Sequence, residues 1–518
     1  MSWQQEVDEL NERRRLAHKM GGEAGIERQR AQGKLTVRER IDLFADPGSF
    51  REFAGLVGSA TYAEGQLAGF TPKGSVDGFC TVDGRKVVVA AGDFTVRGGS
   101  GGGDRGGLGT EMAPNRRALE WRLPYIRLLD AAGGSVRSFE EIGRTYLPDG
   151  NVMSAPDVKL LRVVPVVSAV LGSVAGLPAV NAPMSHFSVM VKGVSQLFPG
   201  GPPVVKAALG IEITKEDLGG EQIHGHISGV CDNVAESEVE AFAMVRQFLG
   251  YLPANVWEMA PRRETADDPE RADESLLSLV PKDRRRPYNA HDLIRSVVDE
   301  GSFFEIGGLH ARSRITGLAR LNGYPVGVMA NNPRHLGGAT DVLSGAKVMR
   351  LLQLCDTFHL PVVSFADEPG FMVGPESERQ GIERAGARLV SVVCDSQMPW
   401  LTIVVGQLYG VAGQCQHRPT GMFRRYAWPS ANWGSMHIEG GASAAYRREI
   451  QSAPDPEAKR AEVEAMLKAI ASPFRTAEAT GQDIIDPRET RALACEFVED
   501  AQPILRSQLG QTAVPYRP

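Results

Sequence analysis

Short apolar runs alternate with amphipathic stretches along the whole chain. Runs such as VVPVVSAVLG (residues 163–172) and WLTIVVG (400–406) have the length and the β-branched content of buried strands. Stretches such as SEVEAFAMVRQFLGYL (237–252) and AKVMRLLQLCDTFHL (346–360) place apolar residues at helical spacing. Because strands and helices alternate, the pattern predicts an α/β fold.

One pattern occurs twice. DPGSFREFAGL (residues 46–56) returns as DEGSFFEIGGL (299–309), and residues 76–101 align without a gap on residues 315–340. Each copy predicts a strand, a tight Asp-Gly or Asn-Gly turn, a second strand and a glycine-containing loop before a helix. The chain is therefore interpreted as a duplicated domain.

A stretch rich in proline and charge separates the two copies. Residues 259–288 show little apolar periodicity and are typical of a linker. The predicted organisation is a first domain over residues 1–258, a linker over 259–288 and a second domain over 289–518. A chain of 518 residues is also too long for one ordinary core.

Composition excludes several classes of protein. Hydrophobic residues make up 42% and charged residues 23%, and the formal charge of −6 gives no basic field for nucleic acid. The six cysteines form no Cys-x-x-Cys pair, which favours thiols in a reducing compartment. The first twenty residues lack an apolar signal core, and no apolar run has membrane-spanning length. We expect a cytoplasmic protein with no membrane partner.

The glycine-rich stretch RGGSGGGDRGGLGT (residues 97–110) fits two incompatible motifs. It matches the dinucleotide pattern G-x-G-x-x-G and also G-x-S-x-G with Ser100 as nucleophile. The second copy of the repeat keeps only the Gly-Gly pair and matches neither motif. We interpret the stretch as a turn that needs residues without side chains, beside a ligand.

Several blocks resemble one known family. GKLTVRERIDLFADPGSF (33–50), VPKDRRRPYNAHDLI (280–294), ADEPGFMVG (366–374) and YAWPSA (426–431) are similar to the carboxyltransferase β-subunits of biotin-dependent acyl-CoA carboxylases, the propionyl-CoA and methylcrotonyl-CoA carboxylase family. The resemblance covers nearly the whole chain. It implies two crotonase-like domains, with acyl-CoA bound mainly by the first and carboxybiotin by the second. It also implies a homohexamer with active sites between subunits.

The mechanism that the resemblance implies needs few catalytic side chains. Biotin, attached to a separate carrier protein, delivers the carboxyl group and serves as the base, and the coenzyme A thioester becomes the enolate. The protein mainly supplies backbone N–H donors to two oxyanions, each worth about 3 to 4 kcal/mol. No Met-Lys-Met biotinylation sequence is present, so the chain should need separate biotin carboxylase and carrier subunits.

Matched residue by residue to the family, two turns carry the donors. In LGSVAGLPAVNAP (171–183) the amides fall on Gly176 and Leu177, with Ala175 beside them. In GQLYGVAGQCQ (406–416) they fall on Val411 and Ala412. Gln414 occupies a position associated with selection of the acyl group, where many family members have aspartate.

Further substrate contacts are expected around the first turn. Gly133 and Gly134, in LLDAAGGSVR (128–137), would allow a close backbone approach to the thioester. Possible partners of the CoA phosphates are the basic residues Arg97, Arg105, Arg116, Arg117 and Lys206. His224 and His226 lack a third ligand at helical spacing, so no metal site is expected.

Two other functions remain open. A CoA-dependent decarboxylase subunit that passes CO2 from an acyl-CoA to biotin would use the same turns. A crotonase-like protein that does not use biotin, such as a hydratase or a scaffold, would need an acid pair near Gly176, and the sequence shows none there.

Overall fold

The computed structural model describes residues 2–99, 113–134, 140, 143–145, 154–283, 286–418 and 420–518. Within these ranges the chain forms two compact units, residues 1–258 and 259–517. The expected turn containing Ser100 and Arg105 lies outside the described residues.

The first unit is built on a parallel sheet with an antiparallel edge. Its strand order is β1-β4-β5-β6-β7-β9-β11, in which β1, β4 and β5 are antiparallel and the remaining pairs are parallel. Two small sheets, β2-β3 and β8-β10, accompany it. The strands are β1 (Arg51–Phe53), β2 (Gly58–Ala63), β3 (Gln66–Pro72), β4 (Ser75–Val82), β5 (Arg85–Gly92), β6 (Tyr125–Leu129), β7 (Val166–Val170), β8 (Ser173–Ala175), β9 (Phe187–Val191), β10 (Gln196–Phe198) and β11 (Asn233–Ala235).

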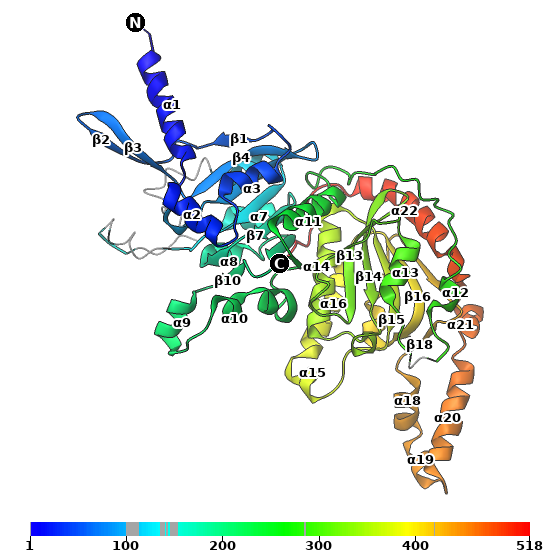
Figure 1. Cartoon of the computed structure of the whole chain (residues 1–518). Helices are drawn as coiled ribbons and strands as arrows, with labels where there is room; N and C mark the ends of the chain where they lie inside the picture. The colour runs from blue at the N-terminus through cyan, green and yellow to red at the C-terminus, as the bar shows by residue number, and fades with distance from the viewer. Residues whose placement is uncertain are drawn as a thin grey trace. The chain divides into compact units, whose positions relative to one another are not determined.

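Several helices of the first unit pack on this sheet, whereas α1 extends away from it (Figure 1). A reciprocal capping box between Thr36 and Glu39 fixes the start of α3. The long helix α11 packs phenylalanine and valine side chains on the sheet, including a stacked Phe248–Phe187 pair. The helices are α1 (Gln4–His18), α2 (Glu23–Ala31), α3 (Val37–Phe44), α4 (Pro114–Trp121), α7 (Ala155–Leu160), α8 (Leu177–Asn181), α9 (Pro202–Leu209), α10 (Lys215–Gly219) and α11 (Glu238–Tyr251), with a π-helical segment at Gln222–Ile227.

The second unit repeats the same sheet. Its order is β12-β13-β14-β15-β16-β17-β19, again antiparallel between the first three strands and parallel afterwards, with β18 paired to the end of β16. The strands are β12 (Phe304–Glu305), β13 (Arg314–Leu321), β14 (Tyr324–Asn331), β15 (Val362–Glu368), β16 (Trp400–Tyr409), β17 (Phe423–Ala427), β18 (Asn432–Gly434) and β19 (Asp483–Ile484).

Helices cover both faces of this second sheet. In Figure 1, α14 and α16 lie on one side, and α13 and α22 lie on the other. Leu293, Ile294, Phe497 and Val498 of the latter pair are buried against the strands. The helices are α12 (Leu276–Leu279), α13 (Ala290–Val297), α14 (Val342–Phe358), α15 (Pro375–Arg379), α16 (Ile382–Asp395), α17 (Gly410–Gln414), α18 (Ile438–Ala445), α19 (Arg447–Ser452), α20 (Pro456–Ile470), α21 (Pro473–Thr480) and α22 (Thr490–Ser507).

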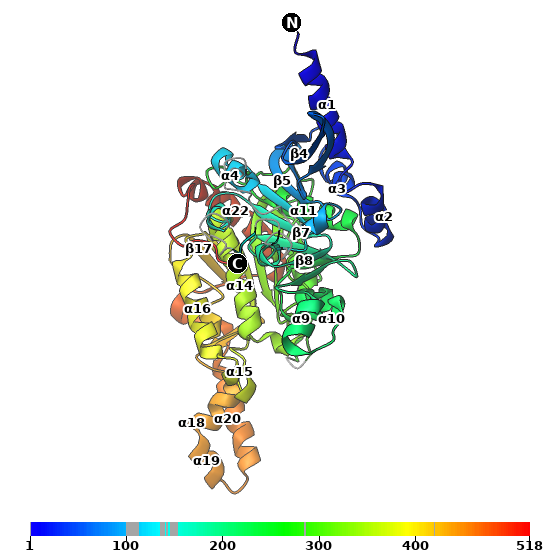
Figure 2. The same cartoon turned by 90° about the vertical axis from the view of Figure 1, so that its left-hand side faces the viewer.

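Helices α18, α19 and α20 form an arm of the second unit. Figure 2 shows them pack on one another and extend away from the sheet. Among the described residues, no helix is both long enough and apolar enough to cross a bilayer.

The predicted duplication is confirmed down to single turns. The Asp83-Gly84 turn joins β4 to β5 and the Asn322-Gly323 turn joins β13 to β14, and all four residues have φ between 48° and 78°. Such angles belong to the tight hairpin turn that Asp-Gly and Asn-Gly favour. Short 3-10 turns at Arg97–Gly99 and Leu336–Gly338 follow at equivalent places.

Residues 259–288, for which a linker is predicted, pack within the second unit. The Arg263 N–H donates to the Gly323 carbonyl at 3.0 Å. Leu276 and Tyr288 are buried in the core of that unit. Arg491 of α22 also donates to the carbonyl of Asp268 at 2.8 Å.

Candidate functional site

The first predicted turn lies between β8 and α8. Gly176 has φ 68° and ψ −140°, a conformation that residues with a side chain rarely adopt. Leu177 is the first residue of α8, so its N–H has no partner within the helix, and Pro178 follows with no N–H at all. The Gly176 N–H points the other way and donates to the Phe198 carbonyl at 3.3 Å. The Gly176 N–H is therefore already engaged with β10. The Leu177 N–H has no acceptor in α8 or in β10.

The predicted glycines of the neighbouring loop meet this turn. Gly133 has φ 80°, and a methyl group there would lie 2.6 Å from the Ala175 carbonyl oxygen. Any larger residue at this position would push the two backbones apart. Gly134 is exposed, with open space where its side chain would be. The structure thus places Gly133 against the backbone of Ala175 and Gly176.

A third turn, Arg97–Gly99, is bonded to the loop that contains Gly133. The Ala132 N–H donates to the Gly98 carbonyl at 2.8 Å, and the Ala175 N–H donates to the Ala131 carbonyl at 3.0 Å. The ends of β5, β6 and β8 are therefore tied into one backbone surface. Arg97 is exposed on the first of these turns, with φ 52°.

A buried ion cluster lies under the three turns. The Asp130 carboxylate is fully buried and accepts from Arg40 at 2.9 Å, from Lys34 at 3.1 Å and from Gln29 at 2.9 Å. Arg40 also holds Glu238 at 2.8 Å and donates to the Leu171 carbonyl at 2.7 Å. Burial lowers the pKa of Lys34, although Asp130 opposes that effect. The cluster holds the backbone at Leu171, ahead of the first turn.

The second predicted turn, between β16 and α17, has the same construction. Gly410 has φ 60°, and Val411 and Ala412 follow it in the first turn of α17, where N–H groups have no partner within the helix. The Val411 side chain is exposed, whereas Ala412 is buried. The Asp367 carboxylate accepts the Gln407 N–H at 2.6 Å and lies where a methyl group on Gly406 would be, 2.1 Å away. Asp130 is placed in the same way against Gly172, at 2.2 Å.

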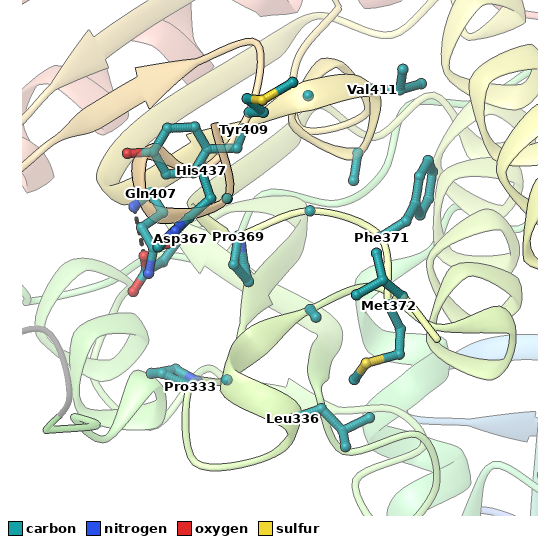
Figure 3. Close-up of a pocket in the computed structure, with 18 of the residues that line it drawn as sticks. Pro333, Leu336, Asp367, Pro369, Phe371, Met372, Gln407, Tyr409, Val411 and His437 are labelled. Carbon is teal, nitrogen blue, oxygen red and sulfur yellow. Dashed lines mark hydrogen bonds between the residues drawn. The ribbon is translucent and has the colours of Figure 1, made fainter. Parts of the chain in front are cut away.

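A cavity of about 1270 Å³ opens in front of this second turn. Figure 3 shows Phe371 near Val411 and Met372 farther along the wall toward Leu336, while Asp367 and Gln407 lie together at another part of the wall. Tyr409 and His437 form an edge-to-face pair with ring centroids 5.4 Å apart. Gln407 adds a polar group to this wall, because its buried Oε1 has no hydrogen-bond partner within the described residues.

Gln414 lies apart from this cavity. It lines a second, smaller cavity of about 480 Å³, together with His417, Arg425 and Gln482. Val411 and Gly410 line both cavities, so the turn forms part of each wall. Gln414 and Ala412 therefore line different cavities, whereas Val411 borders both.

Arg117, Lys206 and His224 have local partners. The Arg117 guanidinium lies 4.5 Å from the Phe53 ring centroid, and Lys206 pairs with Glu212 at 2.6 Å on the surface. His224 Nε2 lies 2.8 Å from the Leu197 carbonyl oxygen. No group of three or more metal-ligating side chains occurs in the described ranges.

Three groups were missed by the reasoning from sequence: Asp130, Asp367 and Arg425. A signal exists for the two aspartates, since each directly follows or ends a buried strand, in IRLLD and VVSFAD. Arg425 follows another arginine in FRRYA and has no distinguishing pattern.

Comparison with known proteins gives one consistent result. A model of the carboxyl transferase domain matches residues 28–502. A propionyl-CoA carboxylase carboxyltransferase subunit of Haloferax mediterranei is 36% identical over 500 residues, 95% of each chain. The methylmalonyl-CoA decarboxylase subunit alpha of Veillonella parvula is 34% identical over 94% of each chain. Among solved structures, the transcarboxylase 12S hexamer with methylmalonyl-coenzyme A bound matches with a TM-score of 0.87 and 32% identity, covering 100% of this chain and 97% of that one.

Proposed function

Because the chain belongs to the carboxyl transferase domain family, we propose that its two glycine turns are the two oxyanion sites of one carboxyl transfer. The chain is the carboxyltransferase component of a biotin-dependent acyl-CoA carboxylase. It moves a carboxyl group from carboxybiotin on a carrier protein to an acyl-CoA. The observation that supports the assignment of the turns is their shared construction, in which a left-handed glycine leads into the exposed N–H groups of a helix start.

The first turn would receive the thioester. The Leu177 N–H faces no acceptor of its own helix and is the donor that is ready for the enolate oxygen. The Gly176 N–H would join it by giving up the Phe198 carbonyl, a bond that is long at 3.3 Å. Gly133 lets the two backbones approach closely at Ala175, Gly134 leaves open space for the acyl chain, and exposed Arg97 would lie toward the CoA phosphates.

The second turn would receive the ureido group of biotin. The residues present fit such a group, because the cavity combines apolar walls from Phe371 and Met372 with the N–H groups of Val411 and Ala412. Gln407 offers a buried acceptor without a partner within the described ranges. When bound, biotin supplies the carboxyl group and the base. The N–H groups of this chain then hold the ureido oxygen and stabilise the negative charge that develops on it.

The assembly follows from the same assignment. We place the acyl-CoA turn in residues 1–258 and the biotin turn in residues 289–518, and we propose a homohexamer in which each active site combines the two from different subunits. The 12S neighbour is a hexamer. Partners would be a biotin carboxylase and a biotin carboxyl carrier subunit. Light scattering tests this model, since a stable and active monomer would contradict it.

A labelled-carboxylate assay tests the function. The purified chain, supplied with its carboxylated carrier partner, should transfer label to at least one short or branched acyl-CoA in a panel. Failure with every thioester would refute the assignment.

The reverse direction is a second candidate because a decarboxylase subunit is 34% identical over nearly the whole chain. In that case the same assay, started from labelled carboxyacyl-CoA and free biotin carrier, should run faster than the forward assay, and a membrane protein should copurify.

A further inference from the structure

The smaller cavity beside Gln414 contains a cation that the carboxyl transfer reaction described above does not use. Arg425, on β17, lines this cavity of about 480 Å³ with His417, Gln414 and Gln482. Its Nε donates to Gln482 Oε1 at 2.6 Å, and its Nη1 lies 3.3 Å from His417 Nε2. Gln482 is itself held in place, because its amide nitrogen donates to the Arg425 carbonyl at 2.9 Å. The guanidinium is therefore fixed at the cavity wall.

No carboxylate balances this charge. Within the described ranges, Arg425 forms no ion pair, and both of its side-chain partners are neutral groups. Burial and the neighbouring Arg425 lower the pKa of His417 to about 4, so the imidazole is neutral at pH 7. Burial also lowers the pKa of Arg425, yet a guanidinium stays charged at any physiological pH.

The preceding residue shows the contrast. Arg424, on the opposite face of the same strand, is paired with Glu496 at 3.0 Å and with Asp500 at 2.7 Å. Strand alternation thus directs one arginine to two carboxylates on α22 and the next arginine into a cavity without any. A half-buried cation whose only hydrogen-bond partners are neutral is expected to attract an anion.

We propose that the Arg425 cavity is a carboxylate-binding site. A planar guanidinium matches a carboxylate with two parallel N–H bonds, and the Nη groups of Arg425 would form them because its Nε already donates to Gln482. The Gln414 amide lines the same cavity and would add a donor. Gly410 and Val411 separate the cavity from the larger one, so its ligand would bind next to the reacting groups.

The position of the cavity suggests the source of the carboxylate. This step rests on the proposed function. If the Val411 turn takes part in carboxyl transfer and Gln414 contacts the acyl group, then an acyl chain of a few carbons that ends in a carboxylate would place that end at Arg425. The substrate class would be acyl-CoA thioesters with an ω-carboxylate. A free small organic acid could supply the same group, and the experiment separates the two sources.

The test measures binding and preference on the full chain with its carrier partner. Free glutarate is titrated by calorimetry, and glutaryl-CoA is compared with pentanoyl-CoA, which has the same number of acyl carbons. Arg425→Met should weaken glutarate binding about 10- to 100-fold, the loss expected for charge-assisted hydrogen bonds. Arg425→Lys keeps the charge without the fork and should lie between. The matched control Arg424→Met should bind glutarate like the unmodified protein.

Each outcome decides the proposal. Arg425-dependent binding together with a glutaryl-CoA preference that Arg425→Met removes supports an acyl-borne carboxylate. Arg425-dependent binding without any preference supports a free acid as the ligand. Equal binding by Arg425→Met and the unmodified protein, or no binding and no preference, overturns the site. If no acyl-CoA is carboxylated at all but Arg425-dependent binding persists, the proposed function fails and the cavity assignment stands.

Discussion

The turns at the starts of α8 and α17 occupy equivalent places in the two units, but one residue makes them differ in the N–H groups they offer. Each has a glycine with positive φ, Gly176 at 68° and Gly410 at 60°. Each rests on an aspartate that occupies the space beside an earlier glycine. In both, the strand segment before the turn pairs in parallel with a short strand, β10 or β18. At the second position after the glycine, however, the first unit has Pro178 and the second has Ala412.

This difference determines which N–H groups each turn can offer. Proline has no N–H, so the first turn cannot use the position that Ala412 occupies in the second. Its donors must be Gly176 and Leu177, and Gly176 is engaged with Phe198. The second turn can use Val411 and Ala412 without breaking any bond within the helix. The two turns therefore offer N–H groups from different positions: the glycine and the next residue in the first turn, and the two residues after the glycine in the second. The second turn is better preorganised to bind an oxyanion, because its N–H groups break no helix bond.

Exchanging this one residue between the turns should have the largest effect. Ala412→Pro removes one donor where the first turn shows that proline fits the backbone, so carboxyl transfer should fall about 100- to 1000-fold. The reciprocal change, Pro178→Ala, adds an N–H and should leave the rate within about threefold. Steady-state kinetics with carboxylated carrier measures both. A fully active and folded Ala412→Pro variant would contradict the donor role of Ala412.

Gly176→Pro is not a clean probe of the first turn. Proline requires φ near about −65°, and Gly176 has φ 68°, so the variant would disrupt the backbone as well as remove the donor. The proline exchange at Ala412 avoids this problem.

The ion clusters beneath the two turns give a second contrast. In the first unit Arg40 and Lys34 converge on Asp130, whereas in the second Arg314 pairs with Glu368 at 3.1 Å amid neutral partners such as Gln416. Arg40→Met removes the guanidinium that holds Asp130, Glu238 and the Leu171 carbonyl and should cost the first unit about 3–5 kcal/mol. Urea unfolding followed by circular dichroism measures this loss. The surface control Arg30→Met, which breaks an exposed pair with Glu39, should cost less than about 1 kcal/mol.

His417 distinguishes the second unit by its response to pH. Its pKa is lowered from an ordinary value of 6.5 to about 4 in the folded chain. As the pH falls, this imidazole is therefore protonated in the unfolded chain at a higher pH than in the folded chain. The native state should therefore lose stability between about pH 6.5 and pH 4, by at most about 3 kcal/mol. His417→Asn should flatten the unfolding free energy across this window. An unchanged slope in the variant would show that other groups cause the pH dependence.

Gln414 should have the smallest effect on the best rate. Replacement by Asp or Ile changes the charge and shape of the smaller cavity but removes no reacting group, so it should alter the ratio of kcat/KM values among acyl-CoAs about tenfold. A panel of aliphatic and carboxylated thioesters measures the ratio. A uniform fall for every substrate would instead show that Gln414 acts in the chemistry itself.

The sequence predicted those features of the fold that depend on local rules. The repeat gave the two sheets because Asp-Gly and Asn-Gly turns and buried strand runs recur at fixed spacing. The two turns are located by their match to the family, and their glycines suit the positive φ that Gly176 and Gly410 adopt. The match of the chain to the carboxyltransferase family is confirmed as well.

Features that depend on tertiary contacts could not be predicted. Nothing local shows that the Gly176 N–H bonds to Phe198 from another strand, or that Gln414 lines a different cavity from Ala412. Residues 259–288 have the composition of a linker, yet their carbonyl and N–H groups pair with the second unit. Arg425 differs from Arg424 because, among the described residues, it has no carboxylate partner. The sequence alone does not show which partners a side chain has.

A structure of the assembled protein with an unreactive acyl-CoA analogue and biotin bound tests the central claim most directly. We expect the thioester oxygen to lie about 2.7–3.1 Å from the Leu177 nitrogen of one subunit, and the biotin ureido oxygen to lie at the same distance from the nitrogens of Val411 and Ala412. A thioester oxygen held by the second turn, or placed beyond hydrogen-bond reach of both turns, would contradict it.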